Sequence, residues 1–122
     1  MRREVLRAKL HRAHVTRCDV DYEGSCLLDA DLLDAMDAWP YEAVEIYDIT
    51  NGARFKTYLI PGARGSGELC INGAAAKLVN VGDLVILCCY GQVSTPPATP
   101  PIIVLVDERN RVREPAPTPR GA

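Results

Sequence analysis

The sequence lacks the features of a membrane, secreted or nucleic-acid-binding protein. No apolar run approaches the ~20 residues that a membrane-spanning helix needs. The basic start, Met1–Arg3, is not followed by the apolar segment of a secretion signal. The formal net charge is −2, and no basic patch is interleaved with aromatic residues. We therefore expect a cytoplasmic protein that has neither a membrane nor nucleic acid as a partner.

Metal-binding and hydrolase motifs are also missing. The five cysteines show no Cys-x-x-Cys spacing and no histidine partners, and their odd number argues against a closed disulfide framework. We interpret them as small buried hydrophobic residues and expect no metal site. A Gly-x-Ser-x-Gly motif is absent and 122 residues are few for an α/β-hydrolase, which disfavours a serine hydrolase.

The patterns that are present mostly predict strands. Hydrophobic residues make up 48% of the chain and charged residues 25%, which is typical of one globular domain with a single core. A short helix is expected after Asp29, a favourable helix N-cap, and a hairpin at Asn51-Gly52. Strands are predicted at residues 4–11, 14–20, 43–50, 54–60, 69–71, 84–90 and 102–106.

These elements predict one mainly β domain, a small barrel or sandwich, over residues 1–113. From residue 114 onward three prolines alternate with small residues, so we expect 114–122 to form a disordered tail. Strict alternation places Lys9 and His11 together on the face opposite the core, and Thr57 and Tyr58 on opposite faces. From spacing alone, such residues are most simply interpreted as solvated strand positions.

The bond between Gly24 and Ser25 offers more specific chemistry. If the backbone holds the serine hydroxyl against the preceding carbonyl, the oxygen can attack it and convert the amide into an ester. β-Elimination then breaks the chain, and the remainder of Ser25 loses ammonia to become a pyruvoyl group, an electrophilic ketone that no side chain supplies. Most Gly-Ser pairs are turns, so the neighbouring motifs decide between the two interpretations.

The neighbouring motifs are Lys9-Leu10-His11-Arg12, Tyr22-Glu23-Gly24-Ser25-Cys26, Thr50-Asn51-Gly52, Arg54, Thr57-Tyr58, Arg64-Gly65-Ser66, Asn72-Gly73-Ala74-Ala75-Ala76 and Val81-Gly82-Asp83. Taken in this order, they resemble pyruvoyl-dependent aspartate 1-decarboxylase. The resemblance extends from Leu6 to about Leu87, and beyond Tyr90 we match no motif. It implies a six-stranded double-psi β-barrel with short helices, assembled as a homotetramer with active sites between subunits.

The resemblance also implies an activity. The chain would cleave itself into residues 1–24 and 25–122, with the pyruvoyl group made from Ser25 as its covalent cofactor. L-Aspartate would form a Schiff base with this group and be decarboxylated to β-alanine and carbon dioxide. The β-alanine would supply pantothenate and coenzyme A biosynthesis. Whether a maturation partner assists the cleavage is left open by the sequence.

Individual residues receive roles from the same resemblance. Ser25 and Tyr58 are the implied catalytic residues, with Tyr58 donating a proton after carbon dioxide leaves. The fork of Arg54 and the point charge of Lys9 suit the substrate's carboxylates. The implied substrate-binding residues are Thr57, Gly73, Ala74, Ala75, Arg54 and Lys9. The implied processing residues are Gly24, Ser25, Thr57, Tyr22 and Asn72.

Several alternatives remain at this stage. A non-enzymatic double-psi β-barrel binding module would keep an intact chain. A serine hydrolase is a further alternative, which the absence of a Gly-x-Ser-x-Gly motif disfavours. Pyruvoyl chemistry on another amino acid, such as glutamate, is a third alternative. The parts played by His11, Tyr22 and Asn72 stay open.

Overall fold

The computed structural model describes residues 1–113, which form one eight-stranded sheet with a short α-helix and a 3₁₀-helix. The prediction of a mainly β fold with short helices is confirmed, whereas the double-psi topology stays a prediction. The predicted tail at 114–122 lies outside the described residues. The elements are β1 (Arg3–His14), β2 (Arg17–Asp19), β3 (Ser25–Asp29), α1 (Ala30–Ala35), β4 (Ala43–Asp48), β5 (Arg54–Gly62), β6 (Leu69–Asn72), η1 (Gly73–Leu78), β7 (Leu84–Val93) and β8 (Ile102–Leu105).

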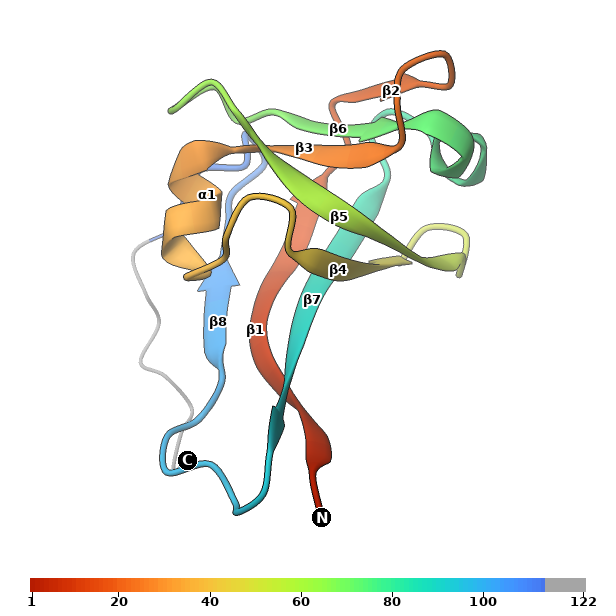
Figure 1. The fold of residues 1–122 in the computed structure, drawn as a ribbon. Helices are drawn as coiled ribbons and strands as arrows, with labels where there is room; N and C mark the ends of the chain where they lie inside the picture. The colour runs from red at the N-terminus through yellow and green to blue at the C-terminus, as the bar shows by residue number, and fades with distance from the viewer. Residues whose placement is uncertain (114–122) are drawn as a thin grey trace.

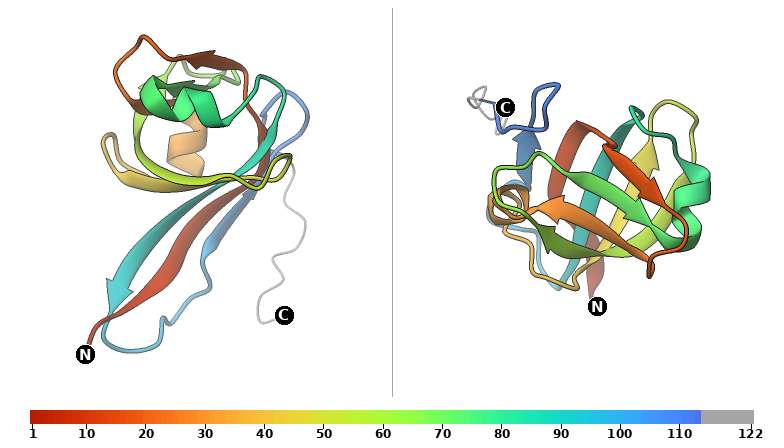
Figure 2. Two further views of the ribbon diagram at one scale, coloured as in Figure 1. Left: turned by 90° about the vertical axis from the view of Figure 1, so that its right-hand side faces the viewer. Right: turned by 90° about the horizontal axis from the view of Figure 1, so that it is seen from above.

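The strands are ordered β2-β6-β3-β5-β4-β7-β1-β8 across the sheet. β1 and β7 form a long antiparallel ribbon, and β2, β3 and β6 lie at the end of it that is remote from the N-terminus (Figure 1). The sheet coils around an interior when it is viewed from the side or from above (Figure 2). β3 pairs in parallel with β5 and antiparallel with β6, so it lies between these two strands.

The core is built from the inward-facing residues of the coiled sheet. Along β1, for example, Ala8 and Leu10 are fully buried while Lys9 and His11 are only partly buried, as the alternation predicts. α1 adds Leu32 to the same core. All five cysteines are free thiols, and four of them are buried as predicted. Among residues 1–113, no helix is long and apolar enough to cross a membrane.

Asp29 caps α1 as predicted and also fixes the loop after β5. Its carboxylate accepts hydrogen bonds from the backbone N–H groups of Asp31 at 2.8 Å, Gly65 at 2.9 Å and Gly67 at 2.9 Å. Burial of the carboxyl group acts to raise its pKa, but these donors outweigh burial, and the pKa of Asp29 is lowered. The end of β3 is therefore anchored to the rest of the sheet by a charged hydrogen-bond acceptor.

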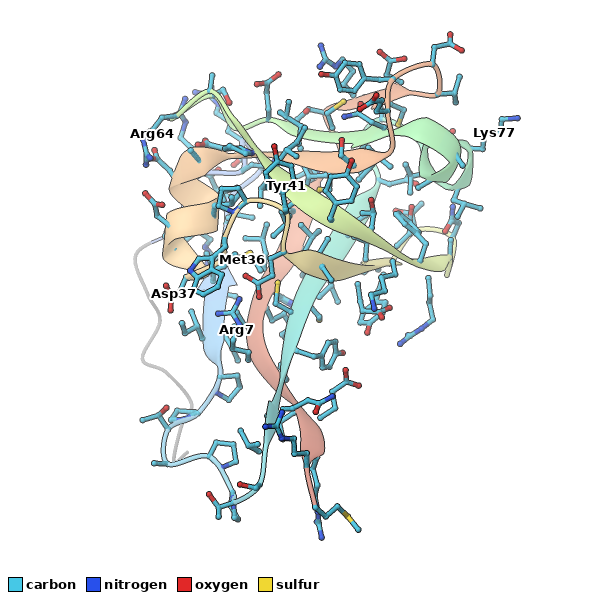
Figure 3. All side chains as sticks on the ribbon, in the orientation of Figure 1. Arg7, Met36, Asp37, Tyr41, Arg64 and Lys77 are labelled. Carbon is cyan, nitrogen blue, oxygen red and sulfur yellow. The ribbon has the colours of Figure 1, made fainter. Side chains whose placement is uncertain are left out.

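Two arginines attach α1 and the segment that follows it to the sheet (Figure 3). Arg7 from β1 donates to the Met36 carbonyl at 3.2 Å and pairs with Glu42 at 2.7 Å. Arg64, which follows β5, pairs with Asp31 of α1 at 2.7 Å. The Arg64 pair is well exposed, so we expect its contribution to stability to be small.

The predicted hairpin at Asn51-Gly52 connects β4 and β5, but by a longer turn than two residues. The Asp48 N–H donates to the Ala53 carbonyl at 2.8 Å, and of the two predicted turn residues only Gly52 takes a positive φ, 81°. Inside this loop, the Asp48 carboxylate accepts hydrogen bonds from the backbone N–H groups of Thr50 and Asn51. The hairpin prediction is confirmed, with the aspartate side chain bonded to the backbone inside the loop.

Candidate active site

Ser25 begins β3, and its hydroxyl is buried and held from two sides. Ser25 is 2% exposed, and its partner across the antiparallel pair, Asn72 at the end of β6, is also 2% exposed. The Asn72 Nδ2–H donates to Ser25 Oγ at 3.0 Å, while Ser25 Oγ donates to the Glu23 carbonyl at 3.3 Å. The hydroxyl therefore has a fixed orientation beside the bond that it is predicted to attack.

Gly73 allows the loop before β3, which contains the predicted cleavage bond and is called the cleavage loop, to approach η1 closely. Its φ is +77°, and a Cβ at this position would lie 2.6 Å from Gly24 Cα and 2.9 Å from Gly24 N. Only glycine tolerates both the positive φ and this contact. The Tyr22 carbonyl lies 3.4 Å from the same point, whereas its side chain is 55% exposed. Gly24 and Gly73 are thus brought into backbone contact, and Tyr22 contributes its main chain.

The predicted residues of β5 lie on the other side of the cleavage bond. β3 and β5 are parallel, with Cys26 opposite Leu59. One residue earlier in each strand, this register places Ser25 beside Tyr58, and Thr57 precedes Tyr58 at the same level as the cleavage loop. The start of β3 is therefore flanked by the predicted catalytic tyrosine on one side and by Asn72 on the other.

The side chains of β5 alternate as predicted. Arg54, Lys56 and Tyr58 are exposed on one face, whereas Thr57 is half-buried on the opposite face. The ring of Tyr58 lies 6.2 Å from the ring of Tyr41, measured between centroids, at an interplanar angle of 33°. Thr57 and Tyr58 thus point to different faces of one strand, and the backbone of that strand lies beside the start of β3. On the far side of the cleavage bond, Ala74 is exposed and Ala75 half-buried at the start of η1.

The two predicted cations lie together elsewhere, on the outer face of β1, β7, β4 and β5. Lys9 is paired with Cys88 in the β1–β7 register. Arg54 stacks over the ring of Tyr47, with Cζ 3.9 Å from the ring centroid. Burial raises the pKa of the Cys88 thiol, and this rise is opposed first by a hydrogen bond with Tyr90 and then by the nearby positive charges of Lys9 and Arg54. Lys9 and Arg54 therefore both lie close enough to the Cys88 thiol to lower its pKa.

Within residues 1–113, neither Lys9 nor Arg54 forms a hydrogen bond with Ser25 or Asn72. The sheet order explains the separation, because β1 is four strands away from β3 and Arg54 lies four residues before Tyr58 along β5. Four strand residues span about 13 Å. One chain thus brings the predicted residues Gly24, Ser25, Asn72 and Gly73 together, while Lys9 and Arg54 lie at a distance from them along the sheet.

Sequence reasoning overlooked two residues that contact predicted ones. Tyr47 supports the Arg54 guanidinium, and its hydroxyl lies 2.8 Å from that of Tyr90. No direct signal for Tyr47 was available in the sequence, because a two-residue turn at Asn51-Gly52 would pair Ile49 with Arg54, and the pairing of Tyr47 with Arg54 follows from the longer loop. Cys70 contacts Asn72, and period-two alternation on β6 places them on one face.

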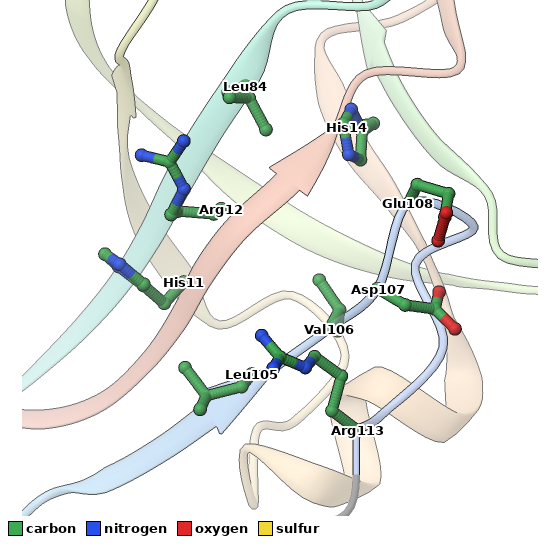
Figure 4. Close-up of a pocket in the computed structure, with 9 residues that line it drawn as sticks. All are labelled: His11, Arg12, His14, Leu84, Leu105, Val106, Asp107, Glu108 and Arg113. Carbon is green, nitrogen blue, oxygen red and sulfur yellow. The ribbon is translucent and has the colours of Figure 1, made fainter. Parts of the chain in front are cut away.

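A separate cavity of about 420 Å³ lies between β1 and the chain after β8 (Figure 4). Burial, followed by the charges of Lys9 and Arg12, lowers the pKa of His11 in its wall. None of the predicted site residues lines this cavity. Residues 1–113 also contain no group of histidine, cysteine or acidic side chains arranged to hold a metal ion. The lining residues are His11, Arg12, His14, Leu84, Leu105, Val106, Asp107, Glu108 and Arg113.

Known proteins resemble this chain over nearly all of its length. The family described as aspartate decarboxylase matches residues 1–113, which extends the match past Tyr90 and through β8. An aspartate 1-decarboxylase of Ralstonia pickettii is 52% identical over 115 residues, covering 93% of this chain and 96% of the relative. The aspartate 1-decarboxylase of Bordetella pertussis is 54% identical over 116 residues, with coverages of 93% and 95%.

Proposed function

The chain belongs to the aspartate decarboxylase family and is an enzyme, and we propose that it converts L-aspartate into β-alanine and carbon dioxide. The observation that carries the mechanism is the Ser25 hydroxyl, buried directly after Gly24 and held between Asn72 Nδ2 and the Glu23 carbonyl. A serine in a surface turn would have neither the burial nor the two fixed partners. This geometry supports self-cleavage at Gly24-Ser25.

The proposed cleavage uses only groups of the chain and one water molecule. Ser25 Oγ gives up its proton and bonds to the Gly24 carbonyl carbon, the C–N bond breaks, and the nitrogen takes up the proton to leave an ester and a free amine. A base then removes the Ser25 Cα proton, and the Cβ–Oγ bond breaks as its electron pair leaves with the Gly24 carboxylate. The resulting dehydroalanine tautomerises to an imine, and water replaces the nitrogen as ammonia.

The residues around Ser25 fit the pyruvoyl group that this cleavage would produce. The group would lie at the start of β3, between Asn72 on one side and Tyr58 on the other. Gly73 leaves room for the main chain to approach it. Once formed, the pyruvoyl group supplies an electrophilic ketone that accepts the substrate amine and the electron pair left behind by carbon dioxide.

The chain's own side chains would perform the remaining tasks. Tyr58 Oη would hold the proton that Cα receives, and Thr57 would stabilise the oxyanion during cleavage. Lys9 and Arg54 would bind carboxylates, and the backbone of residues 73–75 would contact the substrate. Because Lys9 and Arg54 lie at a distance from Ser25 along the sheet of the same chain, we propose a homotetramer in which a neighbouring subunit presents them.

We propose that the enzyme acts in the cytoplasm and supplies β-alanine for pantothenate and coenzyme A biosynthesis. The test is to incubate the purified protein with L-aspartate or with L-glutamate and to identify the products by NMR. We expect β-alanine and carbon dioxide from aspartate, and no product from Ser25→Ala. Preferential decarboxylation of glutamate would contradict the proposed substrate, and inactivity of a fully cleaved protein on aspartate would contradict the proposed function.

A further inference from the structure

A chain of four side chains leads from the surface to the cleavage bond. Arg17 on the edge strand β2 donates from Nε to Cys70 Sγ at 3.3 Å. Cys70 Sγ donates to Asn72 Oδ1 at 3.0 Å, and Asn72 Nδ2 donates to Ser25 Oγ at 3.0 Å. Cys70, Asn72 and Ser25 are buried, while Arg17 is exposed. Each donor in this series of hydrogen bonds has one acceptor. Which atom donates in one bond therefore depends on which atom donates in the bond before it.

This series of hydrogen bonds fixes the orientation of the Asn72 amide. The Oδ1 and Nδ2 ends of an asparagine are nearly equal in size, so the hydrogen-bond partners decide which end faces Ser25. The Cys70 thiol has one proton, and the Nε–H of Arg17 already occupies the acceptor side of its sulfur. The S–H is therefore directed to Oδ1, which leaves Nδ2 facing Ser25 Oγ.

We propose that Cys70 is a positioning residue for self-cleavage, which holds the Asn72 amide with its N–H on Ser25 Oγ, and that Arg17 orients the Cys70 thiol. This inference rests on the proposed function, because it concerns the cleavage at Gly24-Ser25. Cys70 touches no reacting atom in the structure and acts through Asn72.

The N–H donor of Asn72 should accelerate the elimination step of the proposed cleavage. When the Cβ–Oγ bond breaks, negative charge develops on Oγ as the Gly24 carboxylate leaves, and an N–H donor stabilises this charge. An amide turned the other way would present Oδ1, an acceptor, to the departing carboxylate. Loss of the Cys70 donor should therefore slow the second step more than the first, so that the ester accumulates.

The test measures cleavage of newly made Cys70→Ala by intact-mass spectrometry, with and without hydroxylamine, which cuts esters. We expect cleavage to slow by ~3- to 10-fold, the effect of losing one weak neutral hydrogen bond. We also expect a fraction of the uncleaved chain to be cut by hydroxylamine at Gly24. A general loss of packing would slow cleavage without accumulating an ester.

Two variants serve as matched comparisons. Cys70→Ser keeps a donor in place and should restore rapid cleavage without a hydroxylamine-sensitive fraction. Cys89→Ala removes another fully buried thiol, which belongs to the core cluster, and should cleave at the parental rate. A Cys70→Ala protein that cleaves at the parental rate would overturn the inference, and so would a Cys70→Ser protein as slow as Cys70→Ala.

If Cys70→Ala fails to fold, as judged by circular dichroism, Arg17→Met carries the test because Arg17 is exposed. We expect slower cleavage and the same ester fraction, and cleavage at the parental rate without ester would overturn the inference. Failure of the proposed function is distinguishable from these outcomes. A parent chain that never cleaves would overturn both proposals, whereas a cleaving parent with unaffected variants would overturn only this one.

Discussion

At Ser25, a single buried hydroxyl donates one hydrogen bond and accepts another. It accepts from Asn72 and donates to the Glu23 carbonyl, so neither partner can be removed without leaving a buried polar group unpaired. Among residues 1–113, both hydrogen-bond partners of this hydroxyl are neutral groups. We therefore expect the processing rate to depend on the orientation of neutral groups around Ser25.

The hydroxyl of Tyr58 provides a test at the same scale. We expect Tyr58→Phe to cleave normally, because the ring that packs near Tyr41 is retained. Turnover of aspartate should fall by ~10²- to 10⁴-fold, the usual effect of removing one general acid. The measurement is the rate of β-alanine formation by protein confirmed as cleaved. Tyr41→Phe is the control, and near-parental turnover of Tyr58→Phe would remove Tyr58 from the mechanism.

Arg54 should act on substrate capture and not on processing. Arg54→Ala removes the guanidinium that stacks on Tyr47, and it should weaken aspartate binding by ~2–5 kcal/mol, the usual cost of breaking a charged pair. Self-cleavage should be unchanged, because an acyl shift needs no carboxylate-binding fork. Decarboxylation kinetics on cleaved protein supply the measurement. Lys56→Ala, which alters the same face of β5, should bind aspartate normally, and an unchanged affinity in Arg54→Ala would exclude Arg54 from the site.

At the scale of elements, the important feature is that the start of β3 lies between β5 and the β6–η1 junction. Gly73→Ala should disturb this junction, because its Cβ would lie 2.6 Å from Gly24 Cα. Gly82→Ala is a matched control, since Gly82 has a φ of +95° but no atom within 4 Å of the added Cβ. We expect both to lose stability from backbone strain in urea unfolding, and only Gly73→Ala to lose self-cleavage. Equal cleavage in the two variants would contradict the close approach.

Local and long-range features of these elements differ in how well the sequence predicts them. The Asp29 cap and the β4–β5 hairpin depend on residues a few positions apart, and both were predictable. The pairing of Ser25 with Asn72 joins positions 47 residues apart, and periodicity carries no information on which strands become neighbours. Chemistry and family resemblance therefore predict Gly24 and Ser25 as the cleavage bond, whereas the approach of Arg17 to Cys70 depends on the parallel β2–β6 pairing.

For the whole molecule, the separation of the cations from Ser25 predicts sites shared between subunits. We expect Ser25→Ala and Arg54→Ala to be inactive alone and partly active when they are co-expressed, because hybrid oligomers combine an intact Ser25 with an intact Arg54 from another chain. Random pairing would restore about one quarter of parental activity. Light scattering should report a tetramer. Absence of any complementation in mixed oligomers would contradict a site that combines Ser25 of one subunit with Arg54 of another.

The central claim is that this chain makes its own cofactor, and the mass of the purified protein tests it most directly. We predict two polypeptides: residues 1–24 ending in a free carboxylate at Gly24, and residues 25–122 beginning with a pyruvoyl group. The second should be one ammonia lighter than the same chain with an N-terminal serine, and Ser25→Ala should remain whole. A single intact chain after long incubation, with any maturation partner present, would contradict the account.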